Sequence, residues 1–284
     1  MGNSACCQAV CDKSNEILND ERALEDSLDR VDQIAVKVKQ LQEDYDTKRA
    51  QYGDRVKAKQ VNNHVARANP NGTSYEGQMS GNFKSGWGKY TYVDPAGFYE
   101  GEWEENRAHG LGWFKDTAGE YKGNWLAGEK HGLGCETWFD DETVFKGNYV
   151  KGVKQGDGVY QWSDGSSYEG QLRDNVICGH GRLTDDEGVY VGEFLDNAQH
   201  GQGKWQYSNG DFYVGQFVDS LRHGEGTLSW TRENKQYSGQ WAQGVPHGVG
   251  KVTVRDVEKS AYYINGKSCT QENWMRHAAS QKQA

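Results

Sequence analysis

The sequence predicts a mainly β protein: an elongated single-layer antiparallel sheet of stacked β-hairpins, with one long α-helix before it and a short capping helix after it. Three observations predict this fold. A Gly-rich phrase returns eight times at intervals of 22 to 24 residues. Within each phrase, large and polar residues alternate with the period of two that is typical of a strand. Before the phrases, no Gly or Pro occurs between Asn3 and Gly53, which favours one uninterrupted helix.

The composition fits short strands and tight turns and limits the classes of partner. The 284 residues include 37 Gly, 16 Tyr and 10 Trp but only 3 Pro. The sequence has no run of about 18 apolar residues that would predict a membrane-spanning helix, and its N-terminus has no apolar core that would predict a secretory signal. The net charge of −9 argues against nucleic acid as a partner. The six Cys do not form a disulfide framework, which is consistent with a reducing cytosol.

Residues 1–11 form the first element, a predicted acylation segment. MGNSACC resembles an N-myristoylation signal with Gly2 as the acceptor, although Cys6 stands where Ser or Thr is usual. One myristoyl chain holds a membrane only marginally, and residues 12–32 are too acidic to supply a basic second signal. The palmitoylation candidates Cys6, Cys7 and Cys11 would supply it instead. The alternative is an acetylated terminus with three free thiols.

Residues 12–60 form the second element, a predicted helix of about 40 residues and about 60 Å. Apolar or aromatic residues recur there every seven positions, at Ile17, Leu24, Val31, Val38, Tyr45 and Tyr52. The pattern predicts a short coiled coil and so a homodimer through residues 17–52. Two alternatives stay open: a helix that docks back onto the sheet, and a lone helix. Residues 61–74 are the predicted linker, which the turn residues 69–72 connect to the first repeat.

Residues 75–267 form the third element, the repeat array, in which each repeat is one hairpin. Every repeat has Gly two, eleven and thirteen positions after its first aromatic residue. Gly and aromatic residues therefore share one face of the sheet, so that a large ring can lie across a neighbouring strand that lacks a side chain. Polar residues share the other face. The first aromatic residues are Tyr75, Tyr99, Tyr121, Phe145, Tyr168, Tyr190, Tyr213 and Tyr237.

The phrase YEGxWxxGxxHGxG at this spacing closely resembles the MORN repeat, over residues 75–266. The choline-binding repeat of bacterial surface proteins is the rival resemblance, since it is also a Gly- and aromatic-rich hairpin unit. Its repeats are shorter and lack the His-Gly-x-Gly element, which favours the MORN repeat. Some units depart from the pattern: Ser85, Gln155 and Cys178 replace the His, and Met79 and Leu172 replace the strand aromatic. The resemblance implies a scaffold or tether, and some MORN arrays are reported to engage lipids.

Two sets of repeated residues are candidate sites. The first is a row of His whose members would stand about 10 Å apart, too far to share a Zn²⁺ ion whose ligands lie about 2 Å from the metal. We therefore expect a structural role, with no metal and no cofactor, for His109, His131, His200, His223 and His247. The second set is a row of aromatic residues that a single-layer sheet cannot bury fully, and it predicts a partner-binding face. Its members are Trp103, Trp125, Trp162, Trp205 and Trp241.

Residues 268–284 form the last element, a predicted capping helix. Tyr262 to Gly266 look like a partial ninth repeat, and Ser268 with Gln271 has the spacing of a capping box. A helix around Trp274 and Met275 would then cover the last strand edge.

The sequence thus predicts a protein without catalytic residues, because no nucleophile–base pair, phosphate loop or paired-Cys motif occurs. We expect a non-enzymatic scaffold on the cytoplasmic face of a membrane, at the plasma membrane or cell cortex, that recruits a protein partner. One alternative is a soluble structural component of a ciliary or cortical cytoskeletal complex. Another is a phosphoinositide-binding module, although residues 75–284 carry 21 Lys/Arg against 29 Asp/Glu, a net charge of −8.

Overall fold

The computed structural model describes residues 21–281, and it describes side chains from residue 33 onward. The predicted fold class is confirmed: the described residues form the helix α2 (Glu21–Lys57), nineteen antiparallel strands and the short helix α3 (Gln271–Gln281). The chain divides into two compact units. The first unit comprises residues 29–175, and the second comprises residues 176–281 together with 21–28.

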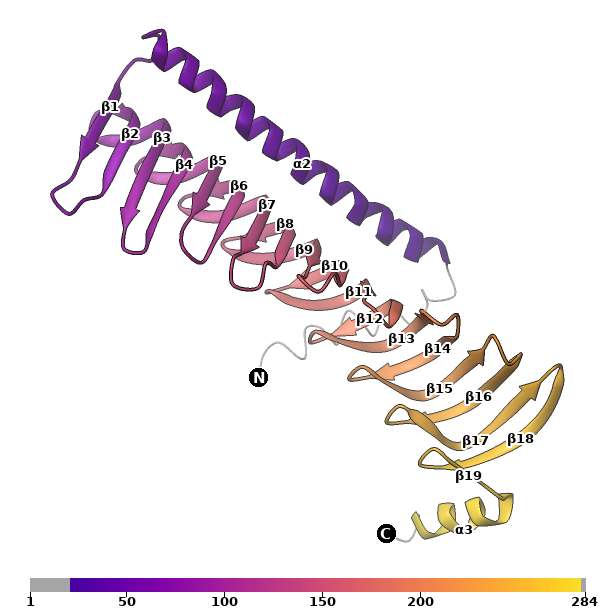
Figure 1. The fold of residues 1–284 in the computed structure, drawn as a ribbon. Coiled ribbons are helices and arrows are strands. Elements are labelled where there is room, and N and C mark those ends of the chain that lie inside the picture. Colours follow the sequence, from indigo (N-terminus) through magenta and orange to yellow (C-terminus); the bar gives the residue numbers. More distant parts are fainter. Residues whose placement is uncertain (1–20, 282–284) are drawn as a thin grey trace. The chain divides into compact units, whose positions relative to one another are not determined.

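In each unit, every strand pairs antiparallel with the next, so that successive hairpins extend a sheet (Figure 1). The strands of the first unit are β1 (His64–Ala68), β2 (Ser74–Ser80), β3 (Phe83–Val93), β4 (Ala96–Glu104), β5 (Arg107–Lys115), β6 (Gly119–Leu126), β7 (Glu129–Trp138), β8 (Val144–Val150), β9 (Val153–Gln161) and β10 (Ser167–Arg173). Those of the second unit are β11 (Val176–Thr184), β12 (Gly188–Leu195), β13 (Ala198–Tyr207), β14 (Phe212–Val218), β15 (Leu221–Trp230), β16 (Lys235–Ala242), β17 (Val245–Val254), β18 (Val257–Ile264) and β19 (Lys267–Cys269).

The first aromatic residue of each repeat packs on the Gly of the neighbouring strand. A Cβ atom added to Gly112 would lie 2.3 Å from the hydroxyl oxygen of Tyr99, so only Gly fits beneath this ring. The Tyr99 hydroxyl donates to the carbonyl oxygen of Glu102 at 2.9 Å. Six other repeats share the hydrogen bond, with the donors Tyr75, Tyr121, Tyr168, Tyr190, Tyr213 and Tyr237. The sheet thus buries its Tyr side chains without a second layer.

A bulge explains the Gly eleven positions into each repeat. The register between β4 and β5 shifts after Gly101, and Gly110 takes a left-handed φ of 55°. The shift frees the Leu111 N–H, which donates to Glu102 Oε1 at 3.2 Å. Side-chain oxygens of Gln78, Glu193, Gln216 and Gln240 accept the matching N–H in their repeats. The repeat therefore favours Glu or Gln three positions after its first aromatic residue.

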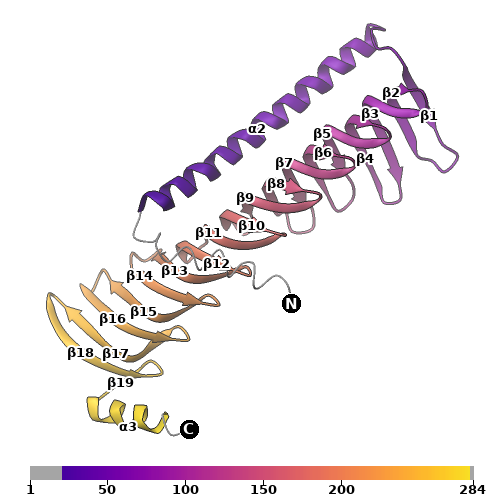
Figure 2. The same ribbon diagram turned by 180° about the vertical axis from the view of Figure 1, so that it is seen from behind.

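We call the side of the sheet that carries the first Tyr of each repeat the aromatic face, and the other side the opposite face. In the first unit, α2 crosses the hairpins (Figure 2) and packs on the opposite face. Tyr45 has an exposed fraction of 0% and contacts Trp87 and Trp113, with ring centroids 5.4 Å and 6.4 Å apart. Arg49 binds Glu100 at 2.8 Å and Lys48 binds Glu102 at the same distance. These contacts leave the aromatic face free of α2.

The seven-residue period of α2 matches the repeat of the sheet. Seven helical residues rise about 10.5 Å, and one hairpin advances the sheet by two strand spacings, about 9.6 Å. Val38, one of the residues of the seven-residue period, is buried like Tyr45, and so are Ile34 and Leu41. For residues 33–57 the structure therefore shows the docking alternative; the side chains of residues 17–32 lie outside the described ones, and the homodimer stays a prediction.

The two ends of the array differ in detail from the prediction. Strand β1 lies inside the predicted linker and pairs with β2, so it extends the sheet by one strand before the first repeat. Helix α3 begins at Gln271, and its cap is Thr270, whose hydroxyl accepts the Asn273 N–H at 3.3 Å, rather than Ser268. Trp274 lies beside Tyr262, with ring centroids 6.4 Å apart, while Met275 is exposed. Neither described helix is long and apolar enough to cross a membrane.

Candidate functional site: the aromatic face

Three of the five predicted Trp residues are structural parts of the aromatic face. The indole N–H of Trp103 donates to the Gly88 carbonyl at 2.9 Å, and Trp125 and Trp241 donate to the equivalent Gly of their preceding hairpins. Trp103 and Trp241 are buried, while Trp125 is partly exposed. Their rings meet the first Tyr of the repeats edge-on, as Trp103 meets Tyr99 at 4.9 Å.

The other two Trp residues stand elsewhere in their repeats, so the five do not form one row. Trp205 lies fifteen positions after Tyr190, and its ring centroid is 5.9 Å from the Tyr190 ring. It is buried, and within the described part of the chain its indole nitrogen has no hydrogen-bond partner. Trp162 is partly exposed and stacks on Tyr160, with ring centroids 5.6 Å apart and an interplanar angle of 2°.

Cations on the aromatic face are the feature that the sequence analysis missed. The Lys84 ammonium lies 4.1 Å from the Tyr90 ring centroid and 4.4 Å from that of Trp103. The Arg222 guanidinium lies 4.5 Å from the Trp241 ring. Both follow the first aromatic residue of their repeats by nine positions, as do Lys130 and Lys154, so the sequence carried a signal for this row. Burial among the rings lowers the pKa of the Lys84 ammonium.

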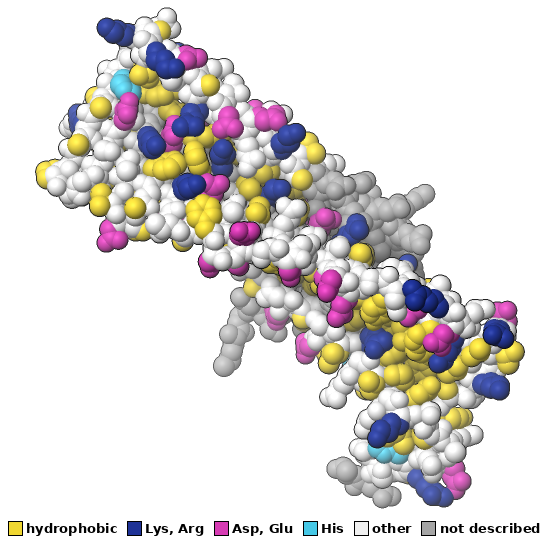
Figure 3. Space-filling view, in the orientation of Figure 1, with side chains coloured by type: hydrophobic (Ala, Val, Ile, Leu, Met, Phe, Trp, Pro, Cys, Tyr) yellow, Lys and Arg dark blue, Asp and Glu magenta, His cyan; other side chains and the backbone are white. Residues whose placement is uncertain are grey.

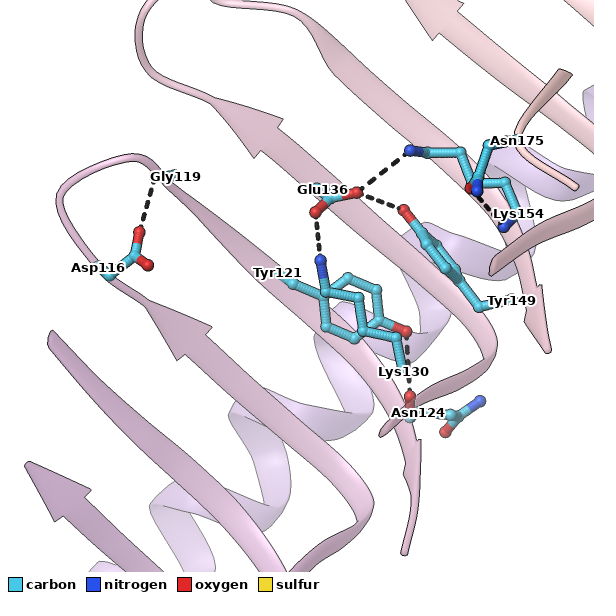
Figure 4. A network of polar contacts seen from close by, with 9 residues as sticks. All are labelled: Asp116, Gly119, Tyr121, Asn124, Lys130, Glu136, Tyr149, Lys154 and Asn175. Carbon is cyan, nitrogen blue, oxygen red and sulfur yellow. Dashed lines mark hydrogen bonds and ion pairs between the residues drawn. The ribbon is translucent and has the colours of Figure 1, made fainter. Parts of the chain in front are cut away.

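A carboxylate interrupts the aromatic face in the third repeat (Figure 4). Glu136 binds Lys130 and lies 3.5 Å from the Lys154 ammonium, and it accepts the Tyr149 hydroxyl at 2.8 Å. The side chains of Glu136 and Lys154 are only 14% and 11% exposed. Burial lowers the pKa of Lys154. Burial and the negative charge of Glu136 both raise the pKa of Tyr149. The equivalent residues of the other repeats are apolar or aromatic: Tyr90, Phe114, Tyr160, Leu183, Trp205, Leu228 and Val252.

The His row makes contacts within and between hairpins. Nδ1 of His131 accepts the Lys151 N–H at 3.4 Å, and Nδ1 of His247 accepts that of Asn265 at 3.3 Å. Nδ1 of His109 lies 3.0 Å from Glu104. The carbonyl oxygens of His109, His200 and His223 accept Tyr hydroxyls of the same repeats. No three His, Cys, Asp or Glu side chains in residues 33–281 are grouped to hold a metal ion.

A pocket lies on the opposite face of the first unit, where the end of α2 meets the sheet. Its volume is about 360 Å³, and its lining includes Tyr52, His64, Trp87 and Glu100. Figure 3 shows hydrophobic side chains mixed with charged ones over β1–β6 and again over β13–β18. The acylation candidates Gly2, Cys6, Cys7 and Cys11 lie outside the described residues.

Comparison with known proteins supports the interpretation of the repeats. The family model of the MORN repeat matches residues 75–94, 99–120, 121–143, 145–167, 168–188, 190–212, 213–234 and 237–253. No curated protein matches the chain. Among solved structures, the chain is similar to the TCP10c domain of Drosophila melanogaster Sas-4, with 9% identity and a TM-score of 0.26 over 60% of this chain and 93% of that one. That likeness is too low to carry an argument.

Proposed function

Since the chain belongs to the MORN-repeat family, we propose that it is a non-enzymatic scaffold that recruits a protein partner along its aromatic face. We propose further that N-terminal lipids hold it on the cytoplasmic face of a membrane. The observation that supports recruitment of a protein partner is that the two faces of the first unit differ in what covers them. The opposite face holds α2 through Trp87, Trp113 and Glu100. The aromatic face keeps partly exposed rings, among them Phe114, Trp125 and Tyr160.

The family membership supports a binding rather than a catalytic role, because MORN repeats are in general non-catalytic units. The site residues point the same way. The charged groups of the aromatic face are bonded to one another or lie over rings, as Glu136 and Lys84 do. A long face of rings and a few cations is suited to holding another chain.

Photocrosslinking tests recruitment. Benzoylphenylalanine replaces Phe114 on the aromatic face in one variant and Val214, which is 44% exposed on the opposite face of the second unit, in the other. We expect a protein crosslink from position 114 and little from position 214. Crosslinks from position 214 alone would contradict recruitment by the aromatic face.

Labelling with a clickable myristate analogue tests the membrane tether. The wild type is compared with Gly2→Ala and with Cys6→Ser/Cys7→Ser by labelling and membrane fractionation. We expect Gly2→Ala to lose the label and both variants to become soluble, because one acyl chain is a marginal anchor. An unlabelled, soluble wild type would favour the soluble ciliary or cytoskeletal component instead. Binding of the unacylated Gly2→Ala chain to phosphoinositide vesicles would favour the lipid-binding module.

A further inference from the structure

The aromatic face of the first unit carries more positive than negative charge, although the whole chain has a net charge of −9. Three of its cations, Lys84, Lys130 and Lys154, each lie over at least one ring, and Arg67 on β1 pairs with Tyr75 on the same face. Glu136 is the carboxylate that accompanies them. Two cations next to one carboxylate leave an excess of one positive charge at this cluster, and Lys84 adds a second.

Lys84 is a half-buried cation without an ion-pair partner among the described residues. Three rings surround its ammonium group: those of Tyr90, Trp103 and, at 5.6 Å, Tyr75. Rings attract a cation through their negative faces but do not replace the water that burial removes. An acidic group brought to the face by a partner would therefore gain a charge-assisted bond to Lys84.

The Glu136 cluster is a second polar point on an otherwise apolar surface. Buried ion pairs are often no more stabilising than apolar side chains of similar volume. An account in terms of stability alone therefore does not explain why this repeat has Glu136 where its neighbours have Phe114 and Tyr160. A role in recognition explains the presence of Glu136, because the cluster would accept only a partner that places a polar or acidic group beside it.

The distance between the two points fits a helix that crosses the hairpins. Lys84 lies on β3 and Lys130 on β7, four strand spacings or about 19 Å apart. Fourteen residues of an α-helix rise about 21 Å and return to nearly the same side of the helix. On the opposite face of the same sheet, α2 already crosses the hairpins (Figure 1), and the rise of one heptad, about 10.5 Å, is close to the advance of one hairpin, about 9.6 Å.

We propose that the aromatic face of the first unit binds an acidic amphipathic helix, with one carboxylate over Lys84 and a second, fourteen residues away, beside Lys130 and Lys154. The apolar side of that helix packs on the partly exposed rings between the two points. This inference rests on the proposed recruitment of a protein partner and names the chemistry of that partner.

A matched pair of synthetic peptides tests the proposal against the full chain. The probe is a labelled 24-residue amphipathic helix with Leu on one side and Glu at its positions 4 and 18, and its control carries Gln at both. We expect fluorescence anisotropy to show about tenfold tighter binding of the Glu peptide, since a charged hydrogen bond contributes roughly one factor of ten or more. Lys84→Gln reduces this preference, whereas Lys89→Gln, on the opposite face of the same strand, leaves it unchanged.

Charge reversal keeps the test independent of small losses in stability. Lys84→Glu should prefer a peptide with Lys at position 4 over the Glu peptide. Equal binding of the Glu and Gln peptides, or an unchanged preference in Lys84→Gln, would overturn the acidic-helix proposal while crosslinking from position 114 could still support recruitment. Failure of both peptides to bind would overturn it as well. So would binding of phosphoinositide vesicles that depends on Lys84, because the acidic group would then belong to a lipid.

Discussion

Replacing Gly112 with Ala tests the packing rule of the repeat, the fit of a Tyr ring over Gly. The added Cβ would lie 2.3 Å from the Tyr99 hydroxyl oxygen and 2.5 Å from two ring carbons. Ordinary contact begins at 3.4 Å, so the ring would have to move by about 3.4 − 2.3 = 1.1 Å. Tyr99 is 2% exposed, and moving it also breaks its 2.9 Å hydrogen bond to Glu102.

The expected loss follows from these two effects. Overpacking costs about 1–3 kcal/mol and a lost hydrogen bond about 1 kcal/mol, so Gly112→Ala should lower the free energy of unfolding by about 2–4 kcal/mol. Urea unfolding followed by Trp fluorescence measures it. Gly53→Ala in α2 is the control: its Cβ meets no atom within 4 Å, so helix propensity alone should raise stability by about 0.5–1 kcal/mol.

A double-mutant cycle identifies the cause. If the clash is with Tyr99, Gly112→Ala should cost much less in a Tyr99→Ala background, with a coupling of about 1–3 kcal/mol. A Gly112→Ala chain as stable as the wild type would refute the reasoning. Additive effects of the two substitutions would refute it too, because they would show that the ring and the Gly are independent.

Three further predictions concern the helix, the tyrosines and the buried charges. Tyr45→Ala should release α2 at a cost of about 3–5 kcal/mol and speed maleimide labelling of Cys135, which lies beneath Gln42 of α2; mass spectrometry of the labelled peptide measures the rate. Tyr45→Phe should leave that rate unchanged or lower it, since the hydroxyl has no hydrogen-bond partner among the described residues. Burial raises the pKa of Tyr237 to about 12, above about 10 for an unfolded chain. The unfolded state therefore binds fewer protons than the folded state above about pH 10. The urea concentration at the unfolding midpoint should decrease as the pH is raised from about 9 to about 11.5, and the absorbance of tyrosinate should increase when the chain unfolds. Glu136→Leu should destabilise the first unit by about 3–5 kcal/mol, and adding Lys154→Leu should restore much of the loss, because the buried ammonium without its carboxylate is the main cost; equal urea midpoints for the single and double variants would contradict this.

The repeated parts of the fold were predictable from the sequence because the same physical constraint acts eight times. Any position that must be Gly, such as Gly112 beneath Tyr99, shows itself in every repeat. The hairpins and the two faces follow from that pattern. The start of α3 was not fixed by pattern, because Ser268 and Thr270 are both capping residues and only the backbone decides between them.

Features that occur once, such as the packing of α2, were harder to predict because a period in the sequence does not identify the surface against which a helix packs. A seven-residue period suits a partner helix, but it equally suits a sheet whose hairpins advance by about 9.6 Å. Trp87 and Trp113 on the opposite face were the sign that a helix covers them, and they were not counted among the functional Trp residues. Likewise, a cation recurs nine positions after the first aromatic residue of several repeats, but only the register shift in the hairpin shows that the Lys84 side chain lies on the aromatic face.

A disulfide test addresses the central claim most directly, namely that α2 covers the opposite face of its own sheet and leaves the aromatic face for a partner. Gln42 of α2 lies within hydrogen-bonding reach of Cys135 on β7. In the full chain carrying Gln42→Cys, mild oxidation should therefore link position 42 to Cys135 within one molecule, which peptide mapping and non-reducing electrophoresis identify as a monomer. A covalent dimer joined through position 42 of two chains, with Cys135 still free, would show that the helix pairs with a second copy and would contradict the account.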